Sequence, residues 1–168
     1  MLNSNQRLEQ WRAAMRPPLP DAWQRLVDTI IRAAEEVQGV LGPGLGTEVY
    51  EVALGHELAL RGLAVERRSV PMTYKGVELP AQELNLVVNG LAAVEVRVGQ
   101  AADAHIAQQA GRLRAADLPL GLMLDFGVLQ VRHGVYRSVN RVATAALGLF
   151  PAMEGLSTEP ILFPGTSA

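Results

Sequence analysis

Polar residues on two neighbouring predicted strands are the candidates for chemistry in this chain. Glu95 and Arg97 lie two residues apart in one predicted strand and therefore share one of its faces, because strand side chains alternate. Asn85 precedes Glu95 by ten residues, across a turn made by Asn89 and Gly90. Carboxylate oxygens at such a place can hold Mg²⁺, a hard cation that prefers oxygen ligands. The more ordinary interpretation is a polar cluster in which Glu95, Arg97 and Asn85 satisfy one another.

Hydrophobic periodicity and turn residues predict the elements that carry these side chains. Asp21 is the expected N-cap of the first core helix. Asn-Gly and Lys-Gly pairs between apolar runs predict tight hairpins. The expected elements are helices at 23–41, 47–61 and 101–116, antiparallel strands at 64–74, 77–88 and 91–98, a doubly covered strand at 118–126, and a strand or hairpin at 129–139. This order predicts an α/β or α+β sandwich with a mixed central sheet flanked by helices.

The composition limits the class of protein. A chain of 168 residues with 49% hydrophobic and 19% charged residues suits one domain with short extensions and excludes a disordered chain. No apolar run is long enough to span a membrane, and the N-terminus lacks the apolar core of a signal peptide, so a cytoplasmic location is expected. The absence of cysteine excludes disulfides and thiolate chemistry. A net charge of -2 argues against a dedicated nucleic-acid binder.

The predicted domain covers 21–140, between an N-terminal extension (1–20) and a C-terminal extension (141–168). The N-terminal extension has a candidate helix at 2–15 that ends in a proline-rich stretch. The C-terminal extension is apolar but is interrupted by prolines, which predicts a short helix followed by an irregular tail.

The segment Leu41-Gly-Pro-Gly-Leu-Gly-Thr-Glu-Val-Tyr-Glu51 resembles the signature of the GxxExxY proteins, a bacterial family with the PD-(D/E)XK nuclease fold. Further matching blocks occur in the same order, and together they cover about residues 22–140. These blocks are 58–63, 74–79, 84–98, 105–108 and 121–127. The resemblance implies an αβββαβ core. It also implies a nuclease site in which carboxylates hold Mg²⁺, and the metal activates water and stabilises the phosphate.

Residue by residue, the chain departs from the family site at three of its four positions. The family's helix glutamate falls on Thr47, its aspartate falls on Asn85, and the lysine of its Glu-x-Lys falls on Arg97. Only Glu95 agrees with the pattern. Glu48 follows the position of the family glutamate by one residue. One residue turns a helix by about 100°, so the Glu48 side chain is expected to point in another direction. The loss of two carboxylates removes much of the attraction for a divalent cation.

Other residues near this pattern have two interpretations each. His105 and Gln108 match the family's His-x-x-Gln helix and lie one turn apart, facing the former site or packing on the sheet. Strand alternation places Glu83 on the same face as Asn85. Glu83 is then either a displaced metal ligand or, more ordinarily, a solvated residue at the end of a strand. Lys75, the one lysine, is expected in a turn at the other end of a strand, where it cannot replace the family lysine.

The sequence therefore predicts a PD-(D/E)XK-like protein with a degenerate site, no catalytic residues and no cofactor. We expect a binding or assembly module whose partner is a second copy or another protein, contacted through the extensions 1–20 and 141–168. Two alternatives remain open. One is a Mg²⁺-dependent DNA or RNA nuclease with a rewired site that retains Glu95. The other is a non-catalytic nucleic-acid binder.

Overall fold

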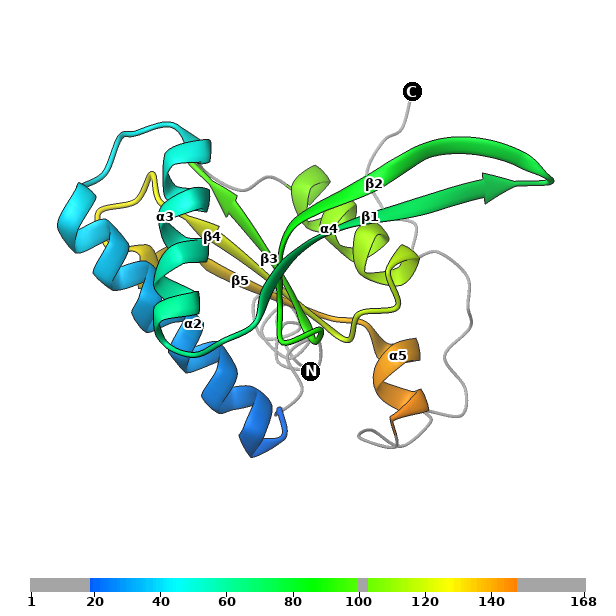
Figure 1. Ribbon diagram of the computed structural model, residues 1–168, viewed down its shortest axis with the longest axis horizontal. Coiled ribbons are helices and arrows are strands. Elements are labelled where there is room, and N and C mark those ends of the chain that lie inside the picture. The colour runs from blue at the N-terminus through cyan, green and yellow to red at the C-terminus, as the bar shows by residue number, and fades with distance from the viewer. Residues whose placement is uncertain (1–18, 100–102, 148–168) are drawn as a thin grey trace, which may run out of the picture.

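The computed structural model describes residues 19–99 and 103–147 (Figure 1). The elements in chain order are α2 (Asp21–Leu41), α3 (Thr47–Leu60), β1 (Val65–Tyr74), β2 (Val77–Val88), β3 (Ala92–Arg97), α4 (Asp103–Ala115), β4 (Leu120–Asp125), the 3₁₀ helix η1 (Val131–Gly134), β5 (Val135–Val139) and α5 (Arg141–Ala146). None of the described helices combines the length and apolar character that crossing a membrane requires. The candidate helix at 2–15 and the proline-interrupted tail lie outside the described residues.

Five strands form one mixed sheet in the order β1-β2-β3-β4-β5. The pairs β1–β2, β2–β3 and β4–β5 are antiparallel, and β3–β4 is parallel. A parallel pair needs a long crossover, which α4 supplies. The predicted three-stranded meander and the α/β class with a helix-flanked mixed sheet are therefore confirmed.

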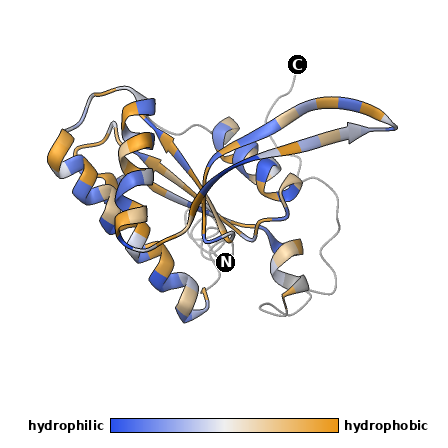
Figure 2. Ribbon diagram, viewed as in Figure 1, coloured by the Kyte–Doolittle hydropathy of each residue, from blue (hydrophilic) through white to orange (hydrophobic). Residues whose placement is uncertain are grey.

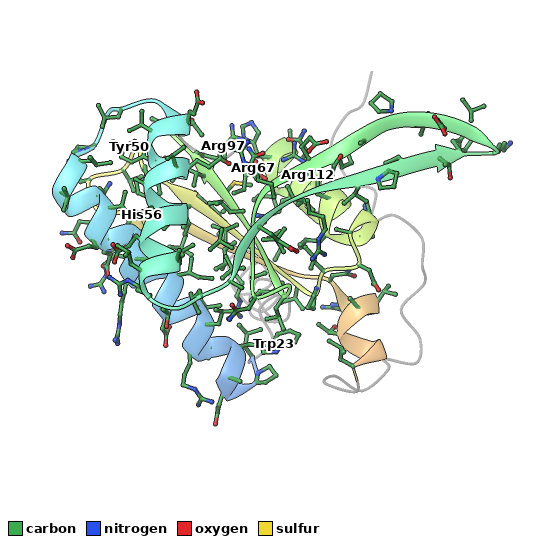
Figure 3. The ribbon with its side chains drawn as sticks, viewed as in Figure 1. Trp23, Tyr50, His56, Arg67, Arg97 and Arg112 are labelled. Carbon is green, nitrogen blue, oxygen red and sulfur yellow. The ribbon has the colours of Figure 1, made fainter. Side chains whose placement is uncertain are left out.

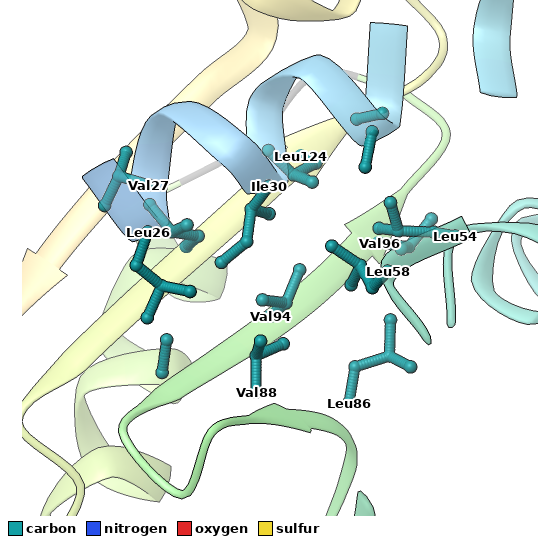
Figure 4. Packing of buried hydrophobic residues seen from close by; sticks show 14 of the residues in the cluster. Leu26, Val27, Ile30, Leu54, Leu58, Leu86, Val88, Val94, Val96 and Leu124 are labelled. Atoms are coloured by element: carbon teal, nitrogen blue, oxygen red, sulfur yellow. The ribbon is translucent and has the colours of Figure 1, made fainter. Parts of the chain in front are cut away.

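Helices α2 and α3 cover one face of the sheet, and α4 lies against the other (Figure 1). Apolar residues recur every three or four positions along α2, so that Leu26 and Ile30 point together at the sheet. They pack over Val94 of β3 and Leu124 of β4 (Figure 4). Every residue of β4 is buried, as predicted for a strand covered on both faces.

Two local details differ from the sequence predictions. Asp21 is already the first residue of α2, whose N-cap is Pro20 and makes no side-chain cap bond. The helix expected to end at residue 61 ends at Leu60, with Arg61 as its C-cap. The segment 129–139, expected as a strand or a hairpin, contains one strand, β5, preceded by the 3₁₀ helix η1.

The β1–β2 hairpin extends well beyond the body of the protein (Figure 1). Pairing between β2 and β3 ends at Leu86 and Val94, so the preceding part of β2 pairs with β1 alone. The pairing register shifts twice, once between Glu66 and Arg68 and once between Val70 and Met72. The tip is the tight turn that Lys75 and Gly76 were predicted to form, and both have positive φ.

Candidate functional site

The predicted site residues on β3 face α4, near the end where β3 and β4 finish. Glu95 and Arg97 alternate with Val94 and Val96, which belong to the core under α2 and α3. The charged pair therefore points to the other face of the sheet, as the sequence predicted. There α4 passes over β3 and β4, and its Arg112 reaches Glu95. Figure 3 labels Arg112 and Arg97, the two arginines that contact Glu95.

Glu95 is the centre of a half-buried charge cluster. Its Oε1 accepts from Nη1 of Arg97 at 3.4 Å, and its Oε2 accepts from Nη1 of Arg112 at 3.2 Å. Nη2 of Arg97 lies 2.8 Å from Nε2 of His105. The three charged side chains are 20–27% exposed, so solvent screens their attraction only in part. Both oxygens of the Glu95 carboxylate are thus engaged by guanidinium groups.

This donor set does not suit a divalent cation. Mg²⁺ needs several oxygen ligands and compensating negative charge. Across residues 19–99 and 103–147, no three His, Asp or Glu side chains come together in a way that could hold a metal ion. Glu95 meets two permanent positive charges instead, and these would repel a cation at the same position.

Thr47 and Glu48 open α3 and are both exposed. This end of α3 is fixed by Tyr50, whose ring stacks on Phe126 with the ring centroids 4.5 Å apart. The Tyr50 hydroxyl donates to the carbonyl of Gly42 and accepts from the amide of Leu45 at 3.1 Å. The tyrosine of the signature therefore ties the α2–α3 loop to the end of β4, and neither Thr47 nor Glu48 bonds to the charge cluster.

Asn85 lies beside a β-bulge that the sequence did not reveal. Between Glu66 and Arg68 of β1, the paired residue of β2 changes from Val87 to Leu84, so β2 contains one extra residue there. The Asn85 side chain is exposed and has no hydrogen-bond partner within the described residues. The polar cluster predicted for Glu95 and Arg97 exists, but Arg112 and His105 complete it rather than Asn85.

Glu83 accepts a hydrogen bond from the Ser69 hydroxyl of the paired strand. Leu84 and Val87 pack in the same cluster although they are three residues apart, so simple alternation fails between them. This break lies between Leu84 and Val87, beyond Glu83, so the face predicted to be shared by Glu83 and Asn85 stays a prediction. Lys75 lies at the far tip of the hairpin, beside the Tyr74 ring, as its predicted place in a turn requires.

On α4 the buried glutamine is Gln109, whereas Gln108 is exposed. Oε1 of Gln109 accepts from the Ser138 hydroxyl of β5 at 2.8 Å, and its Nε2 is buried without a partner among the described residues. His105, Gln109 and Arg112 follow one another at spacings of four and three residues, which is one stripe of a helix. This spacing was the signal that could have identified Gln109 and Arg112 from the sequence.

Asp125 ends β4 next to Arg97 of β3 and is buried. Its Oδ1 accepts from the amides of Gly99 and Gly127, at 3.0 and 2.8 Å. Beside it lies an open hollow of about 450 Å³ whose wall includes His133 and Tyr136. A Cβ on Gly127 would lie 2.7 Å from the Gly99 amide nitrogen, so this carboxylate closes a tight backbone junction. Its role in the described structure is to join the ends of β3 and β4.

Comparison with known families agrees with this architecture. A family model for the PD-(D/E)XK nuclease superfamily matches residues 24–138, which is most of the chain and includes every strand of the sheet except the last residue of β5. No curated protein and no solved structure matches the chain significantly.

Proposed function

Because this chain belongs to the PD-(D/E)XK nuclease superfamily and its one remaining site carboxylate is bound by two arginines, we propose that it is a non-catalytic member. In this proposal it is a GxxExxY-type protein with a degenerate site, which uses the nuclease scaffold as a binding or assembly module. No cofactor is part of the proposal.

The pairing of Glu95 carries the argument. A carboxylate that held Mg²⁺ would have to release Arg97 and Arg112 and leave both positive charges beside the metal. Thr47 and Asn85 add no charge, and their exposed positions supply no second carboxylate. Arg97 keeps a positive charge where the family has lysine, but its planar group binds carboxylates as a fork and is always protonated. These features support a cluster that stabilises the fold in place of a metal site.

The expected partners are a second copy or another protein, with the extensions 1–20 and 141–168 as the proposed contacts and the cytoplasm as the proposed location. Within the described domain, α3 supports an assembly role because it carries exposed apolar residues among its polar ones. Leu54 and Leu58 face the core, whereas Val52 and Leu60 are exposed.

A cleavage assay with a restored variant tests the proposal. We expect the wild-type chain neither to cut DNA or RNA with Mg²⁺ or Mn²⁺ nor to take up either metal in calorimetric titration. The triple variant Thr47→Glu, Asn85→Asp, Arg97→Lys returns the family residues and serves as the positive comparison. Cutting by the wild type that disappears in Glu95→Ala would overturn the proposal in favour of a rewired nuclease.

A second candidate, a non-catalytic nucleic-acid binder, is favoured by the surplus of donors in the cluster. Two guanidinium groups share one carboxylate, and the Nε atoms of Arg97 and Arg112 are buried without a partner among the described residues. A phosphate would supply the acceptors. We would then expect oligonucleotide binding that weakens steeply with salt and is reduced by Arg112→Gln but not by Arg25→Gln on the exposed side of α2.

A further inference from the structure

The distal half of the β1–β2 hairpin has two chemically different faces. Directly opposed residues of an antiparallel pair point to the same side, and here Met72 opposes Leu79 while Tyr74 opposes Val77. These four apolar residues therefore form one face, which we call the arm face. Along β1 it continues inward to Val70, which is buried in the cluster beneath α4.

The arm face is open to solvent although it continues the core. Tyr74 and Val77 are each 61% exposed, and Leu79 is 43% exposed. Figure 2 shows hydrophobic residues continuing along the hairpin beyond the body of the protein. The opposite face is polar, with Ser69 opposing Glu83 and Thr73 opposing Glu78. The hairpin is thus amphipathic, and its apolar side is not covered by residues 19–99 or 103–147.

We propose that a second copy of this chain covers the arm face, so that two hairpins pack face to face in a homodimer. The inference deepens the proposed assembly role and rests on it, and it adds the arm face to the contacts proposed for the extensions. In a twofold dimer each copy uses the same surface, so one apolar face is matched by an identical one.

The construction of the arm favours contact through its face over contact through its edges. A two-stranded hairpin is only marginally stable in water unless a further layer covers its apolar side. Strand addition at the edges is hindered, because Pro71 and Pro80 lack the amide that a ladder requires. The two register shifts also bend the hairpin, which further discourages edge pairing. The edges are therefore protected, while the apolar face is left uncovered.

Charge favours a second copy as the occupant. Between Val70 and Gln82 the only charged residues are Lys75 and Glu78, so the distal arm has no net charge. Two such arms do not repel each other, and neither an acidic nor a basic partner gains from this surface. The arm face has four apolar side chains, and a buried aromatic side chain such as Tyr74 contributes roughly 150–250 Å² of buried surface. Two such faces therefore form a small protein–protein interface. We therefore expect dissociation in the micromolar range.

Sedimentation velocity on the full-length chain, from low to high micromolar concentration, tests the dimer. The variant Val77→Lys places a charge on the arm face, and Thr73→Lys places the same charge on the polar face of the hairpin. Val77→Lys should weaken dimerisation by at least about tenfold, because the charge would be buried in the contact. Thr73→Lys should dimerise like the wild type. Circular dichroism checks that both variants are folded.

Cysteine labelling gives a second readout, because the natural chain has no cysteine. In Val77→Cys the rate of maleimide labelling should fall as protein concentration rises, whereas in Thr73→Cys it should stay constant. A wild-type chain that is monomeric throughout, or a dimer that Val77→Lys leaves intact, would overturn the arm assignment. A dimer that Val77→Lys leaves intact would contradict the arm contact but not the assembly role. The absence of catalysis is tested by the cleavage assay alone. The arm contact and the proposed function can therefore fail independently.

Discussion

The two faces of the sheet in this protein are built from different chemistry. Beneath α2 and α3 the contacts are almost wholly apolar, as in the packing of Ile30 on Val94 and Leu124 (Figure 4). Beneath α4 the apolar cluster is smaller, and the charge cluster of Glu95, Arg97 and Arg112 lies beside it. The comparison teaches that the first face holds the fold together by apolar packing, while the second places a network of ion pairs beside a smaller apolar cluster.

The largest expected effect is on the apolar face. Ile30→Ala removes a fully buried side chain between α2 and the sheet and should lower the free energy of unfolding by about 2–5 kcal/mol. Urea unfolding followed by circular dichroism measures the change. The exposed Ile106 of α4 provides the matched control, and Ile106→Ala should change stability by less than about 1 kcal/mol. Equal losses in the two variants would contradict the assignment of the main core to α2.

Breaking the charge cluster should have an intermediate effect. Glu95→Ala leaves Arg97 and Arg112 facing each other without their shared acceptor, which we expect to cost about 1–3 kcal/mol in unfolding free energy because all three groups are half-buried. Glu83→Ala on the exposed hairpin should cost about 0.5 kcal/mol or less.

If the cluster acts as a unit, the cost of Glu95→Ala should shrink when Arg97 and Arg112 are also replaced by methionine. A buried ion pair replaced as a whole by apolar groups is often neutral in stability. Additive losses in a double-mutant cycle would instead show that Glu95 stabilises the fold without these arginines.

The smallest expected change in stability distinguishes two neighbouring glutamines on α4. Gln109→Ala removes the bond to Ser138 and part of a buried contact, which should cost about 1–2 kcal/mol. Gln108→Ala, one residue earlier and exposed, should be within about 0.5 kcal/mol of the wild type. Thermal unfolding of the two variants side by side checks the difference, and the reverse order would mean that α4 presents another face to the sheet.

Local patterns in the sequence determined much of this protein. The three- and four-residue spacing of Leu26 and Ile30 predicts α2, and the Asn89–Gly90 turn predicts how β2 and β3 pair, because both signals depend on neighbouring residues alone. The placement of Glu95 and Arg97 on one face was likewise predictable from strand alternation.

What only the tertiary structure decided is which distant groups meet on that face. The spacing of Gln109 and Arg112 places them on one stripe of α4, but the angle at which α4 packs on the sheet brings that stripe to Ser138 and Glu95, and no local signal sets that angle. The bulge beside Asn85 is a shift in the pairing of β2 with β1, just before β2 begins to pair with β3 at Leu86, and no local signal marks it. Strand register and helix packing are collective properties, so the number of charges around Glu95 emerges only when the chain is folded.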